Sequence, residues 1–296
     1  MIGSVCVQSR LRRVKTVTIA IPSLHRPDLT ARCIEFIQRQ TLPSSQWEVI
    51  VIENEARPGY ILPDPLPANT TRIELPDNEG TTGSINRAVA RSSSLYILLL
   101  NNDVELEPAY LEKLVCALNA DAKLGFAAGK LLRSTQRSDI DGAGDALLMG
   151  GGAFRLGHHD RADGRFERTL PILGGCGAAV LYRRDVFERC GSLDEDFFAY
   201  LDDMDLGMRA HWLGYRGIYL PDAIAYHLGS ATLGDVLHPR IIEYITRNQI
   251  FLLMKDYPRA HVWRLLPRIA IFQLLWFAFA LRNHGFTPYW RGWRAA

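Results

Sequence analysis

The stretch LYILLLNNDVELE, residues 95–107, places six uncharged and mostly apolar residues directly before two asparagines and an aspartate. A continuous apolar run of this length is typical of a β-strand that is covered on both faces of a sheet. Asn101, Asn102 and Asp103 follow where such a strand would emerge. An Asn or Asp after a strand is often a turn former, but the end of a buried strand also suits ligand binding, so both interpretations stay open.

Segments on both sides of this run alternate between predicted strands and helices. The strands before it are KTVTIAIPSLHRP at residues 15–27, WEVIVIEN at 47–54 and TRIEL at 71–75. The helices before it cover residues 28–40, with Asp28 as the expected N-cap, and the stretch through Ile85, Ala88 and Val89. This order predicts an α/β fold, Rossmann-like, with a mostly parallel central sheet flanked by helices, in which ligands bind beyond the carboxyl ends of the strands.

The chain after residue 107 continues with a predicted helix at 108–121 and a predicted strand at 125–132. Residues 133–169 show weak periodicity, and we expect a long excursion with a hairpin around GGGAFRLG at 150–157. Further strands are expected within residues 174–191, at 217–221 and at 223–232.

Composition bounds the class of protein. The 296 residues are 48% hydrophobic and 22% charged, with a net charge of +2, which does not indicate a nucleic-acid partner. Five widely spread cysteines lack the close pairs of zinc or redox motifs, and we expect reduced thiols in the core. The N-terminus shows no secretory pattern, so a cytoplasmic location is expected.

Two polar clusters have the residue types that chemistry needs. Asp202, Asp203 and Asp205 stand close together, either as the acidic first turn of a helix or as a general base tuned by its neighbours. His227 follows an apolar run, and a lone His is more often structural than a ligand. Together with the Asp103 carboxylate, however, it would suit Mn²⁺ or Mg²⁺ when phosphate oxygens and water complete the coordination.

Eight segments in this order resemble a family 2 glycosyltransferase of the GT-A fold, of the rhamnosyltransferase kind. They are IAIPSLHRP, VIVIEN, DNEGTTGSINRAVA, YILLLNNDVELEP, GGCGAAVLYRRDVF, DEDFFAYLDDMDLGMRAHWLGYR, AYHLGSAT and TRNQIFLLMKDYP. The resemblance implies a GT-A catalytic domain at residues 14–240, with a nucleotide-binding part at about 14–105 and an acceptor part at about 106–240. An N-terminal extension at 1–13 and a C-terminal helical extension at 241–296 would flank it.

The resemblance also implies the residues of a nucleotide site. The matching positions are Pro22, Ser23, Arg26, Glu53, Asn78, Gly80, Gly83, Asn86, Asn101, Asn102 and Arg247, with Asn248 beside the last. His25 stands where this family usually has Asn, and Glu53 stands where it usually has Asp. The base of the nucleotide is therefore left open, and a dTDP or UDP sugar is expected.

The remaining site residues follow from the same resemblance. Asp103 and His227 match the metal ligands, which implies Mn²⁺ or Mg²⁺ as cofactor. Asp203 matches the catalytic base, Asp202 is the second choice, and Asp205 is expected to be structural. The matching GGCG segment places Gly174, Gly175 and Cys176 at the donor or acceptor sugar.

The implied activity is inverting transfer of rhamnose or a similar hexose to a glycan or polyprenyl-linked acceptor in cell-surface polysaccharide synthesis. A sugar-nucleotide nucleotidyltransferase and a non-catalytic carbohydrate-binding protein remain alternatives. The first would usually carry a basic Gly-rich loop after the first strand, and PSLHRPD at residues 22–28 is not one.

The C-terminal tail has an unusual charge pattern. From residue 257 onward it carries no acid and six arginines, two of which, Arg268 and Arg282, bracket the apolar stretch IAIFQLLWFAFAL at 269–281. Thirteen residues are too few to span a bilayer, so the stretch predicts a buried or interfacial helix. Peripheral contact with the inner face of the cell membrane and a homodimer interface are equal expectations.

Overall fold

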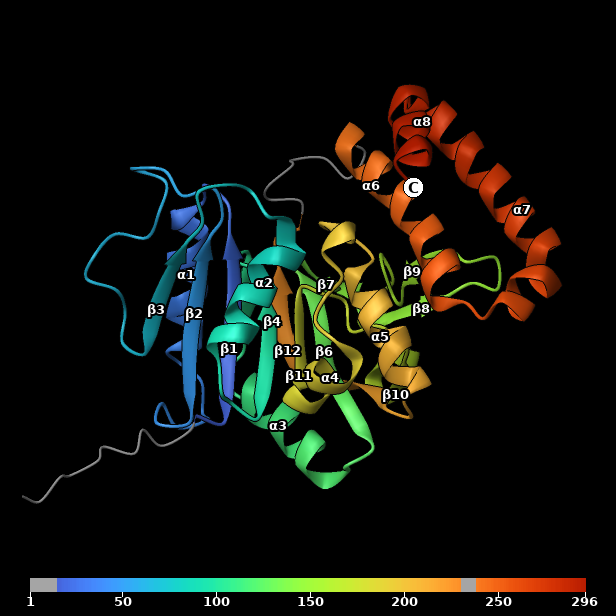
Figure 1. The fold of residues 1–296 in the computed structure, drawn as a ribbon. Coiled ribbons are helices and arrows are strands. Elements are labelled where there is room, and N and C mark those ends of the chain that lie inside the picture. Colours follow the sequence, from blue (N-terminus) through green and yellow to red (C-terminus); the bar gives the residue numbers. More distant parts are fainter. Residues whose placement is uncertain (1–14, 230–237) are drawn as a thin grey trace, which may run out of the picture.

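A computed structural model of the chain describes residues 15–229 and 238–296 (Figure 1). The N-terminal extension predicted at residues 1–13 lies outside the described residues. So do Cys6 and the last three residues of the AYHLGSAT segment.

A ten-stranded sheet forms the centre of the fold. Its order is β10-β12-β6-β11-β4-β1-β2-β3, with β5 paired to β12 and β7 paired to β6. The strands are β1 (Val17–Ser23), β2 (Trp47–Glu53), β3 (Thr70–Glu74), β4 (Tyr96–Leu100), β5 (Val104–Leu106), β6 (Leu124–Arg133), β7 (Gln136–Gly142), β10 (Leu170–Ile172), β11 (Ala179–Arg183) and β12 (Arg216–His227). The strands β3, β2, β1 and β4 run parallel to one another, and β12 runs parallel to β6, whereas β11 is antiparallel to both of its neighbours.

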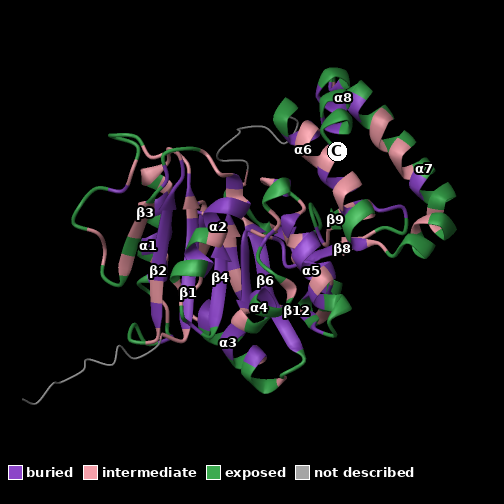
Figure 2. Cartoon of the chain, in the orientation of Figure 1, coloured by how far each residue is buried: buried purple, intermediate pink, exposed green. Residues whose placement is uncertain are grey.

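Helices cover both faces of this sheet, which explains why its central strands are apolar throughout. One core contains α1 (Pro27–Ile37) and α3 (Tyr110–Ala120), and the core on the opposite face contains α2 (Gly80–Arg91), α4 (Arg184–Cys190) and α5 (Asp202–Trp212). Figure 2 shows the buried strands between them. The predicted α/β architecture with a mostly parallel sheet is confirmed.

Several local predictions need correction. The N-cap of α1 is Arg26, and Asp28 lies inside the first turn, because Pro27 occupies the first helical position. The two strands expected at residues 217–232 form one strand, β12, whose register shifts between Leu220 and Ile224. Cys116 is exposed, so it is not a core thiol.

The excursion at residues 133–169 is more ordered than its sequence suggests. Its first part is β7, which extends the main sheet, and the predicted hairpin is β8 (Asp145–Leu147) with β9 (Ala153–Arg155). The glycines at the hairpin tip fit against the C-terminal helices. A Cβ on Gly150 would lie 2.8 Å from the carbonyl oxygen of Arg268, and one on Gly152 would lie 2.2 Å from the Phe272 ring.

The C-terminal segment consists of α6 (Pro239–Phe251), a π-helical turn η3 (Leu252–Asp256), α7 (Arg259–Arg282) and α8 (Phe286–Ala295). Figure 1 shows them gathered to one side of the sheet, with α7 outermost. The apolar stretch at 269–281 is part of a longer helix than expected. With 24 residues, α7 is long and apolar enough by length and composition to cross a membrane, and most of its side chains are not buried (Figure 2).

Candidate active site

A cavity of about 560 Å³ opens where the strands β1, β2 and β4 reach their carboxyl ends. Residues that directly follow these strands, among them Asn54 and Asn101 to Asp103, line one part of it. The start of α5, the β8–β9 hairpin and the first turns of α6 line the rest. The cavity thus lies at the edge of the sheet where a parallel α/β fold binds its ligands.

Asp103 and His227 meet in this cavity although they lie 124 positions apart in the sequence. The strand β5 directly follows Asp103 and pairs antiparallel with the end of β12, which brings His227 opposite Val104. Nε2 of His227 lies 3.3 Å from Oδ1 of Asp103, and both side chains are more than nine-tenths buried. Pairing of the two strands therefore creates the contact.

Asp141 of β7 lies on the other side of the His227 ring. Its Oδ2 is 2.7 Å from Nδ1 of His227 and also accepts a hydrogen bond of 2.9 Å from Nη1 of Arg155. Burial would raise the pKa of Asp141, but the contacts with His227 and Arg155 outweigh it and lower the pKa to about 2. Burial likewise lowers the pKa of His227, while its hydrogen bonds with Asp103 and Asp141 prevail and raise the pKa to about 9.

Asp202 and Asp203 begin α5 and also line the cavity. The carboxylate of Asp203 accepts two hydrogen bonds, one of 2.7 Å from the backbone N–H of Gly177 and one of 2.8 Å from that of Met204. Burial, followed by the neighbouring charge of Asp203, raises the pKa of Asp202 to about 7. The two acids therefore differ in their surroundings: Asp202 is buried and partly protonated at neutral pH, whereas Asp203 accepts hydrogen bonds from two backbone N–H groups.

The segment before α5 has an unusual backbone. Phe198, Tyr200 and Leu201 have φ angles of 62°, 69° and 63°, a left-handed region that such side chains rarely adopt. Asn248 of α6, which is fully buried, holds this segment by donating hydrogen bonds of 2.7 to 3.0 Å from Nδ2 to the carbonyls of Phe197, Ala199 and Tyr200. The C-terminal segment thus fixes the entry to the helix that carries the two acids.

Two asparagines shape the opposite part of the cavity. Nδ2 of Asn54 donates to Oδ1 of Asn78 at 2.8 Å, and Oδ1 of Asn54 accepts the backbone N–H of Glu79 at 2.8 Å. Gly80 has a φ of 71°, and a Cβ there would lie 2.3 Å from the carbonyl oxygen of Phe198. The glycine is required by this contact between the start of α2 and the left-handed segment.

The residues predicted for the site separate into two groups. Those that line the cavity are Pro22, Ser23, Asn78, Gly80, Asn101, Asn102, Asp103, Asp202, Asp203 and His227. Those that do not are Arg26, Glu53, Gly83, Asn86, Gly174, Gly175, Cys176 and Arg247. Roles for both groups stay predictions, and the second group makes contacts within the protein.

Four of these contacts show what the second group does. Glu53 is buried, and its Oε1 accepts the backbone N–H of Leu62 at 2.9 Å. Asn86 bridges α2 to Leu193 by hydrogen bonds of 2.9 and 3.0 Å. Arg247 donates to the carbonyl of Phe197 at 2.6 Å.

In the GGCG segment, the residues next to those predicted for the sugar site line the cavity. The side chain of Cys176 is 1% exposed and belongs to the core, whereas the following Gly177 and Ala178 line the cavity.

Asp103 and His227 fit a divalent cation. A carboxylate oxygen and an imidazole nitrogen face each other within one buried wall, and the contact from Asp141 occupies the other ring nitrogen. A cation at Nε2 would replace the proton that this nitrogen carries in the imidazolium. Within residues 15–229 and 238–296 no group of three or more His, Cys, Asp or Glu could hold a metal, so a diphosphate and water would have to supply the remaining ligands.

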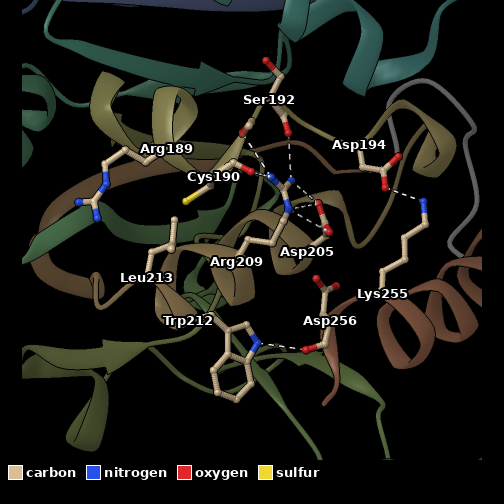
Figure 3. Close-up of a pocket in the computed structure, with 11 residues that line it drawn as sticks. Arg189, Cys190, Ser192, Asp194, Asp205, Arg209, Trp212, Leu213, Lys255 and Asp256 are labelled. Carbon is tan, nitrogen blue, oxygen red and sulfur yellow. Dashed lines mark hydrogen bonds and ion pairs between the residues drawn. The ribbon is translucent and has the colours of Figure 1, made fainter. Parts of the chain in front are cut away.

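A second cavity of about 480 Å³ lies at the far end of α5 (Figure 3). It contains Asp205, which is 1% exposed and paired with Arg209, and Asp256 of η3. Burial, followed by the neighbouring Asp205, raises the pKa of Asp256 to about 8. Asp205 lines this cavity rather than the large one, and its structural role stays a prediction.

Several lining residues were not anticipated from the sequence. They are Asn54, Asp141, Asp145, Arg155, His158, Tyr200, Arg240 and Tyr244. Asn54 is the polar last residue of a predicted buried strand, much as Asn101 follows another, and that signal could have found it. Asp141, Asp145 and Arg155 belong to the long excursion, whose length was the available indication of function.

Comparison with known proteins places these features in a family. Residues 18–191 match the model of glycosyl transferase family 2. The chain is 29% identical over 235 residues to the O-antigen biosynthesis protein RfbC of Myxococcus xanthus, covering 76% of this chain and 18% of that protein. It is 27% identical over 197 residues to the N-acetylglucosaminyl-diphospho-decaprenol L-rhamnosyltransferase of Mycobacterium tuberculosis, covering 59% of this chain and 64% of that one. The chain thus spans less than two thirds of either relative.

Among solved structures, the mannosyltransferase PcManGT from Pyrobaculum calidifontis, in complex with GDP-Man and Mn²⁺, is similar with a TM-score of 0.57 and 15% identity. The match covers 96% of this chain and 86% of that one. This likeness confirms the GT-A fold expected from the sequence.

Proposed function

Because the chain belongs to glycosyl transferase family 2, we propose that it moves rhamnose or a similar hexose from a nucleoside-diphosphate sugar to an acceptor hydroxyl, with inversion. The proposed setting is cell-surface polysaccharide synthesis at the cytoplasmic side of the membrane. The observation that carries the proposal is one cavity lined by Asp103 and His227 together with Asp202 and Asp203. A metal-assisted displacement needs these two kinds of group at one site.

Asp203 is the proposed base. It accepts the proton of the acceptor hydroxyl as that oxygen attacks the anomeric carbon, and its two N–H contacts hold the carboxylate in place for this step. Asp202, partly protonated at neutral pH, is the weaker candidate. A single displacement on one face of the sugar inverts the anomeric centre.

Asp103 and His227 would hold Mn²⁺ or Mg²⁺. When bound, the cation neutralises charge on the departing nucleoside diphosphate. The nucleotide, a dTDP or UDP, is proposed to lie along Pro22, Ser23, Asn78, Asn101 and Asn102, all of which line the cavity. Glu53 accepts the backbone N–H of Leu62 and does not line the cavity. Recognition of the base is therefore proposed to depend on the residues that do line it.

An assay with dTDP and UDP sugars and Mn²⁺ tests the proposal. Release of the nucleoside diphosphate without pyrophosphate supports a glycosyltransferase. Pyrophosphate exchange with a nucleoside triphosphate would instead support a nucleotidyltransferase. Binding without turnover of any sugar nucleotide tested, with glycan and polyprenyl-linked acceptors present, would support a carbohydrate-binding protein.

We further propose that α7 lies in the plane of an anionic membrane, which favours a polyprenyl-linked acceptor. Large apolar side chains are exposed on it, including Trp263 at 75%, Leu274 at 67% and Leu275 at 65%. The segment from residue 257 onward carries six arginines and no acid, which complements anionic headgroups. The close fit of Gly150 and Gly152 on α7 favours an in-plane helix over one that crosses the bilayer, because protein occupies one side of it.

Flotation of the full-length protein with anionic and neutral vesicles tests this membrane contact. Leu274→Asp with Leu275→Asp should abolish flotation, whereas Leu95→Asp, a change at a residue 63% exposed on another surface, should not. Unchanged flotation of the double variant would reject the membrane surface. A homodimer interface would be identified instead by two results together. The wild-type protein would not float with vesicles and would sediment as a dimer, and the variant with both leucines changed would sediment as a monomer.

A further inference from the structure

Three charged residues from three different strands form a continuous line behind the metal-binding side of the cavity. His227 at the end of β12 contacts Asp141 of β7 at 2.7 Å, and Asp141 contacts Arg155 of β9 at 2.9 Å. We propose that Asp141, held by Arg155, is a positioning residue that orients His227 for a divalent cation. The inference rests on the proposed function and adds residues that the resemblance to known transferases did not supply.

The geometry of the His227 ring supports this role. Its two nitrogens face two different carboxylates, with Nδ1 at 2.7 Å from Asp141 and Nε2 at 3.3 Å from Asp103. When Nδ1–H donates to Asp141, Nε2 keeps its lone pair for the cation on the cavity side. Asp141 thereby selects both the tautomer and the rotation of the ring.

Arg155 has a specific place in this arrangement. The side chain of Asp141 is 10% exposed, and a buried carboxylate needs charged or hydrogen-bonding partners. Arg155 supplies one through Nη1, while its Nε lies 4.0 Å from Oδ1 of Asp145. The guanidinium therefore contacts the same carboxylate oxygen of Asp141, Oδ2, as His227 does, and restricts the rotation of that carboxylate.

The same hairpin reaches toward the catalytic end of the cavity. Oδ2 of Asp145 accepts the backbone N–H of Cys176 at 2.8 Å, and the next residue, Gly177, donates its N–H to Asp203. Arg155 thus lies between two acids. One is Asp141, which contacts His227, and the other is Asp145, which holds the turn next to the proposed base Asp203. A plain structural ion pair would not need to be placed between these two groups.

Binding of Mn²⁺, measured by the electron paramagnetic resonance of the free ion, tests the inference on the full chain with and without UDP or dTDP. Asp141→Asn and Asp141→Ala should weaken Mn²⁺ binding about 10- to 100-fold, as loss of an orienting partner does, and Arg155→Gln should weaken it less. Asp139→Asn changes an acid of the same strand that is not part of the cavity, and it should leave Mn²⁺ affinity unchanged. Thermal unfolding of each variant checks that the fold is kept.

A double-mutant cycle separates orientation from general stability. If Asp141 acts through the imidazole, Asp141→Asn should have no further effect on Mn²⁺ affinity once His227→Ala is present. Wild-type affinity in Asp141→Asn, or a full additional loss in the double variant, would overturn the inference and leave the proposed transferase intact. Failure of the wild-type protein to bind Mn²⁺ would overturn this inference together with the proposed metal site.

Discussion

Asp203 and Gly177 are joined by a hydrogen bond of 2.7 Å, in which the backbone N–H of Gly177 donates to Oδ2 of the carboxylate. The bond ties the start of α5 to the turn before β11. It holds the carboxylate at the cavity wall, where an acceptor hydroxyl could reach it.

The first prediction concerns this acid. Asp203→Asn should lower kcat about 10²- to 10⁴-fold, because the base is lost, while the KM for the donor stays nearly constant. Steady-state kinetics measures both. Asp202→Asn is the matched control and should reduce kcat much less, because Asp202 is already partly protonated near neutral pH. The reverse ranking of the two variants would transfer the role of base to Asp202.

The second prediction concerns the cation. Asp103→Ala should reduce the affinity for UDP or dTDP measured with Mn²⁺ to the affinity measured without it, because a carboxylate ligand is removed. Isothermal titration calorimetry gives both values. Glu105→Ala, at an acid that pairs with Arg32 outside the cavity, should keep the effect of Mn²⁺. Equal nucleotide affinity in Asp103→Ala and wild type would reject the metal assignment.

The third prediction concerns Asn248. Replacement by Ala removes the amide that donates to three carbonyls of this segment, of which Phe197 keeps the contact with Arg247. The free energy of unfolding should fall by about 1–3 kcal/mol, and kcat should fall as the start of α5 loosens. Denaturant unfolding and kinetics report the two effects. Asn283→Ala removes one exposed amide contact, to Phe279, and should change neither; similar losses in both variants would contradict the role of Asn248.

The fourth prediction compares two glycines with similar backbone angles. Gly80 has a φ of 71° and Gly59 a φ of 83°, but a Cβ meets the Phe198 carbonyl only in the first case and nothing within 4 Å in the second. Gly59→Ala should cost about 1–2 kcal/mol from the φ angle. Gly80→Ala should cost distinctly more and impair turnover. Equal unfolding midpoints for the two variants would show that the contact with Phe198 relaxes freely.

The fifth prediction concerns pH and the second cavity. The pKa of Asp256 is raised from 3.8 to about 8, so the folded state holds this proton more tightly than the unfolded state. The associated stability is fully present below about pH 3.8 and is lost as the pH rises through about 8.

Asp256→Asn, which stays neutral, should therefore gain stability relative to wild type between pH 5 and pH 9. We expect at least about 1.4 kcal/mol, which corresponds to one pKa unit. Unfolding measured across this pH range tests the difference. The exposed Asp222→Asn should show no such trend, and a flat difference for Asp256→Asn would contradict the raised pKa.

The sequence predicted the elements that depend on near neighbours. The apolar run of β4 and the periodicity of α3 are both local signals, and each element lies where it was expected. The approach of Asp103 and His227 was expected from the resemblance. Its structural cause, the pairing of β5 with the end of β12, connects residues more than a hundred positions apart and has no local signature.

The positions that were not predicted depend on which way a side chain points, and neighbouring residues in the sequence do not determine this. Asp141 and Arg155 come from a stretch of weak periodicity, and pairing of β7 with β6 and of β8 with β9 decides where they point. Cys176 shows the same limit, because its φ of 47° turns the side chain into the core while its neighbour Gly177 reaches the cavity.

Because Asn248 holds the segment before α5, the candidate site cannot be separated from the helix that follows residue 238. A chain cut before Pro239 would retain every strand of the sheet and both Asp202 and Asp203. It would nevertheless lose the amide that donates to the carbonyls of Phe197, Ala199 and Tyr200. It would also lose the wall formed by Arg240, Ile241, Tyr244 and Ile245. The helix α6 is thus part of the candidate site, so a recombination or fusion boundary belongs after α6 rather than in front of it.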